Sequence, residues 1–422
     1  MLNKAQKFIV VGEKTLSGTI TVSGSKNAAL PILCATLLTN EKSEIKNVPD
    51  IVDIRTLLRI FEHMNVKTTF ESGTVTVDPS GLNVEEIPHD LICSMRASIL
   101  LMGPLLARIK EVKLAFPGGC VLGKRSVQAH THVFQKLGGI ILDESQTLHI
   151  KMENPKGATI IMPELSVTGT ENALMLAAAL PQTTQIRLAA AEPHVQDLCR
   201  FLTKMGAKIE GIGTHFLTIT GSTLKGATHE VTGDYLEAGT FAIAGLVTKS
   251  EITIKGIKTE QLDSFWEKLD EAGAKYELKP NEVRILPTET LNHIQNLRTA
   301  VYPSFPTDLQ APFAILLTRA NGKSHIFETL FDGRLQYLYE LEKMGAKVEM
   351  LNPHQATIIG PAHLKGVPIS SLDLRAGAAM VLAALCAQGT TEISGVNYID
   401  RGYENFEGKL SSLGASIQRI QS

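Results

Sequence analysis

Charged side chains stand at the beginnings of several segments that are otherwise almost entirely apolar. Lys26 and Asn27 open one such segment, Arg96 opens a second, and Asp308 and Arg375 open two more. A buried helix needs no charge in its first turn in order to fold, whereas the N–H groups at a helix N-terminus attract anions. Their recurrence predicts an anion-binding site built from several helices, although a solvated helix end with a scattered cation would explain any one of them alone.

A second set of cations lies in loops that precede other helix-like segments. Arg125 follows the glycine-rich stretch PGGCVLGK, Arg334 lies in ETLFDGRLQYL, and Arg401 lies in GVNYIDRGYENF. Arginine binds carboxylates and phosphates through paired, charge-assisted hydrogen bonds. Arginines and a lysine from separate elements therefore suit a ligand with two anionic ends, such as a carboxylate and a phosphate.

Cys120 stands in a context unlike that of the other cysteines. It follows two glycines and precedes Lys124 and Arg125, whose positive charges should lower the pKa of a neighbouring thiol. It is a candidate nucleophile or proton donor, and an incidental surface thiol is the alternative. The remaining cysteines lie in apolar stretches of the sequence and are expected to be buried core thiols: Cys34, Cys93, Cys199 and Cys386.

Asp308 lies in PSFPTDLQAP, just after two prolines. A carboxylate at this position could cap the helix that follows. In a site rich in arginine it could equally act as a general base. The local sequence leaves both roles open.

The composition narrows the class of protein. The 422 residues are 44% hydrophobic, and 41 basic against 43 acidic residues leave a net charge of −2, which does not indicate a nucleic-acid-binding surface. No apolar run reaches the roughly 18 residues that span a bilayer. The N-terminus also lacks the apolar core of about 7–15 residues typical of a secretory signal. We therefore expect a cytoplasmic protein that binds neither nucleic acid nor membrane.

Several common catalytic motifs are missing from the sequence. It contains no GxxxxGK[ST], GxSxG or HExxH pattern, which disfavours a kinase or NTPase. The five cysteines are widely spaced without a CxxC, and the histidines show no ligand spacing. We expect neither a metal nor a cofactor.

The elements that must position these residues follow an internal repeat. A helix-like segment ending in Leu/Met-Gly-Ala/Gly and followed by a strand-like segment recurs at intervals of about 70 residues. The repeated glycines are Gly138, Gly206, Gly273, Gly345 and Gly414, and Asn65 occupies the same place in a degenerate sixth copy. Glycine, and after it asparagine, best tolerates the positive φ that ends a helix.

Each copy also contains a second, uniformly apolar helix-like segment, so the unit is predicted to run strand–helix–strand–helix–strand–strand. Six such α/β units would form two lobes of three. The predicted lobes are residues 24–233, which carry the PGGC loop, and residues 1–23 with 234–422. Two-lobed proteins commonly bind ligands between the lobes. An unrelated array of several α/β domains is the alternative.

Seven motifs together resemble the UDP-N-acetylglucosamine enolpyruvyl transferase family over nearly the whole chain. They are SGSKNAALPIL, PGGC followed by GKR, TGTENALM, EAGT, PTDLQAPF, DLRAGAA and IDRGYENFEGKL. The resemblance implies the two-lobed inside-out α/β barrel of the enolpyruvyl transferases. It also implies transfer of the enolpyruvyl group of phosphoenolpyruvate to the 3-hydroxyl of UDP-N-acetylglucosamine, with release of phosphate, as the first committed step of peptidoglycan synthesis.

The resemblance also implies catalytic roles. Cys120 would donate a proton to the methylene carbon and could form a covalent adduct, while Asp308 would be the base at the sugar hydroxyl. Further cations would face the two ends of phosphoenolpyruvate: Lys26, Arg125 and Arg401 the phosphate, and Arg334 and Arg375 the carboxylate. The PGGC loop would act as a lid that excludes water.

Substrate contacts are implied at further positions. Asn27 would help to hold phosphoenolpyruvate, and the nucleotide sugar would contact Arg96, Arg125, Ser126, Val127, Gln128, Ala129, Asp308 and Leu330. The family usually reads Pro-Val-Asp-Leu-His after the loop arginine, so Ser126 and Gln128 depart from its pattern. Small-molecule substrates are the only partners implied, and no obligate protein partner is expected.

Two other functions compete with this interpretation. The enolpyruvyl transferase that acts on shikimate 3-phosphate shares the fold, but that family lacks the cysteine of the PGGC loop. A weakly catalytic paralogue that binds the nucleotide sugar and regulates the pathway is the non-enzyme alternative. The presence of Cys120, Lys26, Asp308, Arg375 and Arg401 argues against it.

Overall fold

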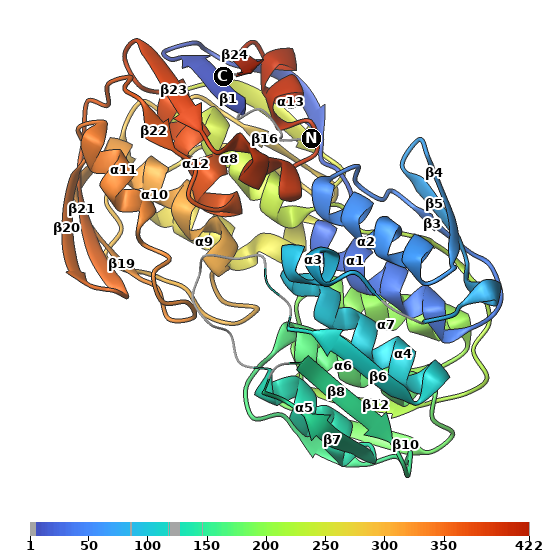
Figure 1. The fold of residues 1–422 in the computed structure, drawn as a ribbon. Helices are drawn as coiled ribbons and strands as arrows, with labels where there is room; N and C mark the ends of the chain where they lie inside the picture. The colour runs from blue at the N-terminus through green and yellow to red at the C-terminus, as the bar shows by residue number, and fades with distance from the viewer. Residues whose placement is uncertain (1–5, 85–86, 117, 119–126, 146, 422) are drawn as a thin grey trace. The chain divides into compact units, whose positions relative to one another are not determined.

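The computed structural model describes residues 6–84, 87–116, 118, 127–145 and 147–421 (Figure 1). These residues form two compact units. The contiguous unit comprises the described residues from 24 to 232, and the split unit comprises residues 6–23 together with 233–421. Each unit has its own hydrophobic core.

The contiguous unit contains three sheets, each built around an antiparallel hairpin. The first has the order β13 (Thr228–Glu230), β3 (Ser43–Lys46), β5 (Thr74–Asp78), β4 (Lys67–Glu71). The second has the order β6 (Glu111–Ala115), β8 (Thr147–Met152), β7 (Gly139–Asp143). The third has the order β11 (Lys208–Glu210), β12 (Phe216–Thr220), β10 (Thr183–Arg187), β9 (Thr159–Ile161).

The split unit also contains three sheets. The first has the order β15 (Tyr276–Lys279), β16 (Glu282–Ile285), β14 (Glu251–Lys255), β2 (Ser17–Thr21). The second has the order β17 (Leu291–Asn292), β19 (Ala320–Phe327), β21 (Gln355–Gly360), β20 (Lys347–Asn352), with β18 (Leu297–Arg298) also paired to β19. The third has the order β22 (Ile369–Ser370), β23 (Thr390–Ser394), β1 (Gln6–Val11), β24 (Ser416–Gln421).

The repeat predicted from the sequence is confirmed at its helix ends. All six capping residues have a positive φ: Asn65 at 55°, Gly138 at 99°, Gly206 at 120°, Gly273 at 71°, Gly345 at 100° and Gly414 at 100°. The helices that end beside them are α2 (Val52–His63), α5 (Gln128–Lys136), α7 (Pro193–Met205), α9 (Asp263–Glu271), α11 (Tyr337–Lys343) and α13 (Phe406–Ser412). The left-handed conformation lets the chain turn directly from helix to strand.

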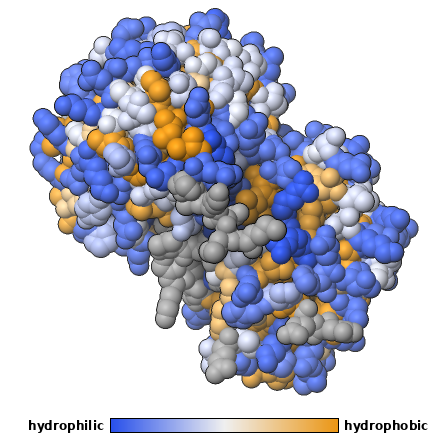
Figure 2. Space-filling view, turned by 45° about the horizontal axis from the view of Figure 1, so that its top comes forward, coloured by the Kyte–Doolittle hydropathy of each residue, from blue (hydrophilic) through white to orange (hydrophobic). Residues whose placement is uncertain are grey.

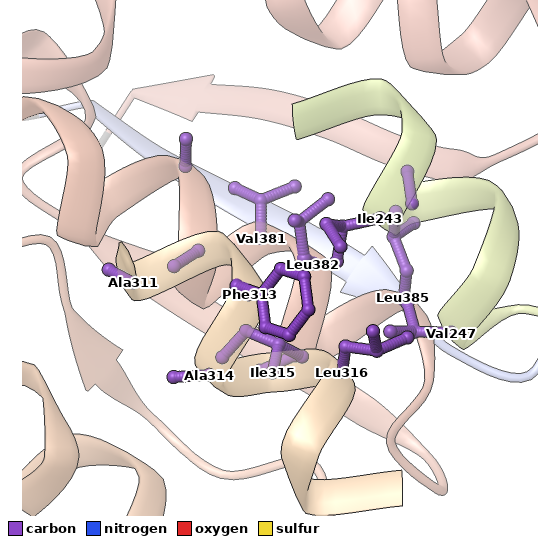
Figure 3. Close-up of a cluster of buried hydrophobic side chains, with 14 of the residues drawn as sticks. Ile243, Val247, Ala311, Phe313, Ala314, Ile315, Leu316, Val381, Leu382 and Leu385 are labelled. Atoms are coloured by element: carbon purple, nitrogen blue, oxygen red, sulfur yellow. The ribbon is translucent and has the colours of Figure 1, made fainter. Parts of the chain in front are cut away.

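The second helix of each repeat is buried. These inner helices are α1 (Lys26–Ala35), α4 (Met102–Ile109), α6 (Val167–Ala178), α8 (Tyr235–Val247), α10 (Gln310–Arg319) and α12 (Leu374–Leu385). In the split unit α8, α10 and α12 pack against one another, and Figure 3 shows Ile243, Phe313 and Leu382 meeting from the three helices. Their uniformly apolar sequences are explained by this burial on all sides.

Side-chain caps begin three of the inner helices. Ser166 accepts a hydrogen bond from the N–H of Gly169, Asp234 accepts from Leu236 and Glu237, and Asp373 accepts from Arg375 and Ala376. Ser25, at the N-terminus of α1, makes no side-chain cap hydrogen bond. On the face shown in Figure 2, hydrophilic residues cover most of the surface, with smaller hydrophobic areas between them.

The first strand of the chain lies inside the last sheet. β1 is antiparallel to β23 on one side and to β24 on the other, with Phe8 opposite Ile393 and Arg419. Figure 1 shows this strand, in blue, among strands from the red end of the chain. The N-terminal segment is therefore a structural part of the sixth repeat.

A cluster of buried charged residues lies in the split unit, close to residue 233, at which the chain returns to this unit. Glu237 accepts hydrogen bonds from the backbone N–H of Ser23 at 2.8 Å and from the Lys409 ammonium. Lys409 also donates to the Ser23 hydroxyl at 2.7 Å, and that hydroxyl donates to Glu404. Burial raises the pKa of Glu237 to about 7, although the Lys409 charge acts in the opposite direction.

This raised pKa predicts a specific pH dependence of stability. Between pH 4.5 and pH 7 an unfolded glutamate loses its proton while folded Glu237 keeps it, so unfolding becomes more favourable as the pH rises. Urea unfolding should show wild type losing about 3 kcal/mol over this range relative to Glu237→Gln. The exposed Glu289, which pairs with Lys249, provides the control Glu289→Gln. Parallel pH profiles for wild type and Glu237→Gln would contradict the prediction.

Candidate functional site

Three charged residues predicted from the sequence meet in the split unit. Asp308 lies in the short 3₁₀ helix η5 (Thr307–Leu309), Arg334 lies between β19 and α11, and Arg375 lies in the first turn of α12. Arg334 Nη2 donates to Asp308 Oδ1 at 2.6 Å, and Arg375 Nε donates to Oδ2 at 3.1 Å. One carboxylate thus joins residues that are 26 and 67 positions away in the sequence.

Neighbouring carboxylates hold the supporting backbone in place. The Asp373 cap fixes the first turn of α12, and Arg375 projects from that turn. Glu328 accepts hydrogen bonds from the hydroxyl of Thr307 at 2.8 Å and from the N–H of Leu330 at 2.9 Å. These two hydrogen bonds connect η5 to the segment that follows β19. They therefore help to fix the backbone that carries Asp308.

The structure resolves one of the two roles left open for Asp308. No side-chain cap is formed at η5 or α10, so the capping role is wrong. Burial raises the pKa of the Asp308 carboxyl, but the charges of Arg334 and Arg375 outweigh it and hold that pKa well below its usual range. In this arrangement Asp308 is an ionised carboxylate and a weak base.

Tyr403 is a member of this cluster that the sequence did not reveal. The guanidinium carbon of Arg375 lies 5.2 Å from the centre of the Tyr403 ring, in cation–π geometry. The Tyr403 hydroxyl in turn lies 2.9 Å from the hydroxyl of Thr240 on α8. The ring therefore fixes the plane of Arg375, and only its closeness to Arg401 in the sequence could have suggested it.

Two further predicted residues belong to the split unit. Arg401 is the last residue of the 3₁₀ helix η6 (Val396–Arg401), which packs against α12, and its side chain is half-buried. Leu330 has an exposed side chain and follows Glu328 by two residues. The element that carries Arg401 packs against α12, and the backbone N–H of Leu330 donates to Glu328.

In the contiguous unit Lys26 is the first residue of α1 and lies beside a buried acid. Its ammonium is 2.6 Å from the carboxylate of Asp53, with only 11% and 5% of the two side chains exposed. Asp53 lies in the first turn of α2, and the sequence analysis missed it because no local signal links it to Lys26. Asn27, the next residue of α1, is half-buried.

A second cluster of this unit involves Arg96 and α5. His130 accepts a hydrogen bond from the Asn172 amide at 2.9 Å through Nδ1, which leaves Nε2 to donate to Thr168 at 3.1 Å. Burial, together with the nearby charge of Arg96, lowers the pKa of His130 to about 3, so this imidazole is neutral at pH 7. The neutral ring anchors the start of α5 to α6.

The predicted nucleotide-sugar residues at the start of α5 are only partly described. Val127 and Ala129 are buried, and Gln128 is exposed. Cys120, Arg125 and Ser126 lie outside the described residues. Their roles stay predictions.

The other cysteines differ in burial. Cys34, Cys199 and Cys386 are buried, as expected, and burial raises the pKa of the Cys386 thiol to about 11. The same expectation is wrong for Cys93, which is only half-buried on α3 (His89–Ser94). Its thiol lies 3.6 Å from the imidazole of His89 and donates to the carbonyl oxygen of Phe116 at 3.4 Å.

The described part of the chain contains no group of three or more His, Cys, Asp or Glu residues that could hold a metal ion. None of its helices is long and apolar enough to cross a membrane. The charged groups described above include cations in the first turns of α1 and α12 and the carboxylate of Asp308. Such groups bind anionic ligands and accept protons.

Comparison with known proteins gives three relatives that match almost end to end. The family model described as EPSP synthase (3-phosphoshikimate 1-carboxyvinyltransferase) matches residues 10–410. Two curated relatives are both named UDP-N-acetylglucosamine 1-carboxyvinyltransferase. That of Methylacidiphilum infernorum is 42% identical over 99% of each chain, and that of Desulfosudis oleivorans is 41% identical over 98% of this chain and 99% of the other. A third, from Nitratiruptor, is 40% identical and has the same name.

Solved structures match the fold over the same extent. The crystal structure of the enolpyruvyl transferase NikO from Streptomyces tendae superposes with a TM-score of 0.90 at 24% identity, covering 99% of this chain and 100% of that chain. An EPSP synthase from Acinetobacter baumannii superposes with a TM-score of 0.75 at 19% identity and the same coverage. The fold seen here is therefore that of the enolpyruvyl transferases.

Proposed function

The chain belongs to the family described as EPSP synthase (3-phosphoshikimate 1-carboxyvinyltransferase), and on this premise we propose that it is a UDP-N-acetylglucosamine 1-carboxyvinyltransferase. The observation that carries this assignment is identity of 40–42% over nearly the full length of three relatives with that name. The acceptor is then UDP-N-acetylglucosamine, and the donor is phosphoenolpyruvate. The product leads into peptidoglycan and so supports cell-wall formation.

The proposed reaction proceeds by addition and then elimination. In the addition, the 3-oxygen of the sugar bonds to C2 of phosphoenolpyruvate, the hydroxyl proton goes to a base, and C3 gains a proton to become a methyl group. In the elimination, the methyl group loses a proton, the bond between C2 and the phosphate oxygen breaks, and the C2–C3 double bond forms again. No electrons are gained or lost overall, so the reaction requires no redox cofactor.

The proposed roles follow the chemistry of the described residues and, for Cys120 and Arg125, the resemblance of the sequence motifs. Asp308 is the carboxylate that accepts the sugar proton, and the buried guanidinium groups of Arg334 and Arg375 suit the carboxylate of phosphoenolpyruvate. Lys26 at the start of α1 suits the phosphate, together with Arg125 and Arg401. Cys120 is proposed as the proton donor to C3. Fixed cations that face developing charge stabilise a transition state by several kcal/mol.

The nucleotide sugar is proposed to contact the contiguous unit through Arg96 and the start of α5. His130 acts there as a positioning residue, because its two hydrogen bonds hold the first turn of α5. Gln128 presents the one exposed side chain among the described residues 127–129. Asp308 and Leu330 are the corresponding contacts on the split unit, and Asn27 helps to hold phosphoenolpyruvate.

We place the reaction in the cytoplasm, where phosphoenolpyruvate and nucleotide sugars are made, with small-molecule substrates as the only required partners. The test is phosphate release from phosphoenolpyruvate with either UDP-N-acetylglucosamine or shikimate 3-phosphate as acceptor. Release with the nucleotide sugar alone supports the proposal. Release with shikimate 3-phosphate alone would replace the acceptor, and binding of the nucleotide sugar without release would favour a regulatory protein.

A further inference from the structure

The two arginines assigned to the substrate carboxylate already bind a carboxylate of the protein itself. Asp308 uses both oxygens, one on Arg334 at 2.6 Å and the other on Arg375 at 3.1 Å. A carboxylate group with one oxygen on each of two guanidinium groups is the arrangement expected for a bound carboxylate substrate. Asp308 is thus a chemical equivalent of that substrate group.

The exposure of the three side chains indicates which of them a ligand meets first. Only 4% of each arginine side chain is exposed, against 27% for Asp308. A carboxylate that approaches from solvent therefore meets Asp308 before it meets either guanidinium group. To reach both arginines it has to take the place that Asp308 occupies.

The charges around the arginines lead to the same conclusion. Besides Asp308, the negative charges of Glu328 and Asp373 act on Arg334. Three carboxylates thus already offset two guanidinium groups. A fourth carboxylate is poorly accommodated while Asp308 stays in place, since like charges in a buried site repel strongly.

One donor of the cluster is left over. Arg375 Nη1 is buried and has no hydrogen-bond acceptor among the described residues. A buried donor without a partner carries a free-energy penalty, which a ligand can relieve by supplying an acceptor. A substrate carboxylate therefore has a hydrogen bond available that Asp308 does not make.

We propose that Asp308 is a displaceable internal ligand of Arg334 and Arg375, and that the carboxylate of the substrate releases it to act as the base. The proposal rests on the proposed function, which supplies the sugar hydroxyl as the proton source. While Asp308 is paired, two positive charges hold its pKa well below the usual range and it is a weak base. Once the incoming carboxylate takes over the guanidinium groups, Asp308 regains ordinary basicity and accepts the proton of the 3-hydroxyl. The base is thereby active only when the carbon that will be attacked is present.

The main test is a binding measurement on Asp308→Asn, with pyruvate as an unreactive carboxylate probe and inorganic phosphate as a probe that lacks the carboxylate. Removing the competing charge should tighten pyruvate binding at least tenfold, while phosphate affinity changes less than twofold. Asp332→Asn is the matched control, because Asp332 is an exposed carboxylate two residues from Arg334 that pairs with His354. It should change neither affinity.

Several results would overturn the proposal. Unchanged or weaker pyruvate binding to Asp308→Asn would mean that the substrate adds to the cluster without displacing Asp308. Equal tightening of phosphate and pyruvate would mean that only the net charge matters. Tightening in Asp332→Asn to the same extent would have the same meaning.

A second measurement needs no variant and so does not depend on the folding of Asp308→Asn. In wild-type protein with ¹³C-labelled aspartate carboxyl groups, saturating pyruvate should shift one carboxyl resonance, and inorganic phosphate should leave it in place. A spectrum in which no aspartate resonance responds to pyruvate contradicts the displacement.

The outcomes separate this proposal from the proposed function. One outcome is that wild type turns over UDP-N-acetylglucosamine while Asp308→Asn binds pyruvate with unchanged affinity. This result supports the proposed function and contradicts the displacement of Asp308. Tighter pyruvate binding in Asp308→Asn, combined with no phosphate release by wild type with that acceptor, supports the displacement and contradicts the proposed function.

Discussion

Replacing Asp308 by asparagine is expected to lower kcat by about 10²–10⁴-fold, the usual contribution of a positioned general base. Asparagine keeps the size and an acceptor oxygen of the side chain, so it can still contact Arg334 and Arg375, but it cannot take the proton of the sugar hydroxyl. The measurement is phosphate release with saturating UDP-N-acetylglucosamine and phosphoenolpyruvate. Asp332→Asn, which removes an exposed carboxylate of the same unit, should retain the wild-type rate.

The same substitution should cost about 3 kcal/mol of stability at neutral pH, because two buried guanidinium groups lose the carboxylate that contacts both of them. The lowered pKa of Asp308 determines the direction in which this stabilisation changes with pH. The stabilisation is complete above the pKa of an unfolded aspartate and is lost as the pH falls through the lower folded value. If Asp308→Asn retained full activity, Asp308 would not be the base, whatever the stability of the variant.

Replacing Lys26 by methionine is expected to lower kcat/KM for phosphoenolpyruvate by about 10²–10³-fold. Lys26 begins α1, where its charge adds to the positive end of the helix dipole, and its side chain is only 11% exposed. A cation that faces a transferring or departing phosphate in a water-poor site is worth several kcal/mol. Methionine keeps the unbranched apolar stem of the side chain and is shorter by one atom, so the effect mainly reports the loss of the ammonium charge.

Lys42→Met is the matched control for Lys26→Met. Lys42 belongs to the same unit, but it is exposed and its ammonium lies 3.5 Å from Asp78. Its loss should change kcat/KM less than twofold, since exposed ion pairs are weak and screened. If Lys26→Met stayed within threefold of wild type while Lys42→Met did the same, the phosphate contact proposed for Lys26 would be wrong.

The parts of the fold that the sequence predicted are those governed by local rules. A helix end that turns at once into a strand needs a residue with positive φ, and the six repeated Gly or Asn positions all have it. Uniformly apolar helices must be buried, and α8 is buried along its whole length. Such features depend on a few neighbouring residues and can be read directly.

The parts that could not be predicted depend on partners far away in the chain. Asp308 precedes a helix and could have capped it, but Arg334 and Arg375 are 26 and 67 residues away and attract its carboxylate instead. Lys26 likewise contacts Asp53, which lies in a different helix. The local sequence allows more than one role for such a side chain, and ion pairs with residues far away in the chain determine which role it takes.

The position of β1 between β23 and β24 has a consequence for the order of events during synthesis. The contiguous unit needs only residues 24–232, so it can fold while the second half of the chain is still being translated. β1 is translated long before both of its neighbours in the sheet, because these come from residues 390–421. Until they are translated, both edges of β1 stay available for pairing with other chains. A nascent chain that stalls before residue 390 therefore carries a folded contiguous unit and an unpaired β1. We expect aggregation of such a chain to begin at β1.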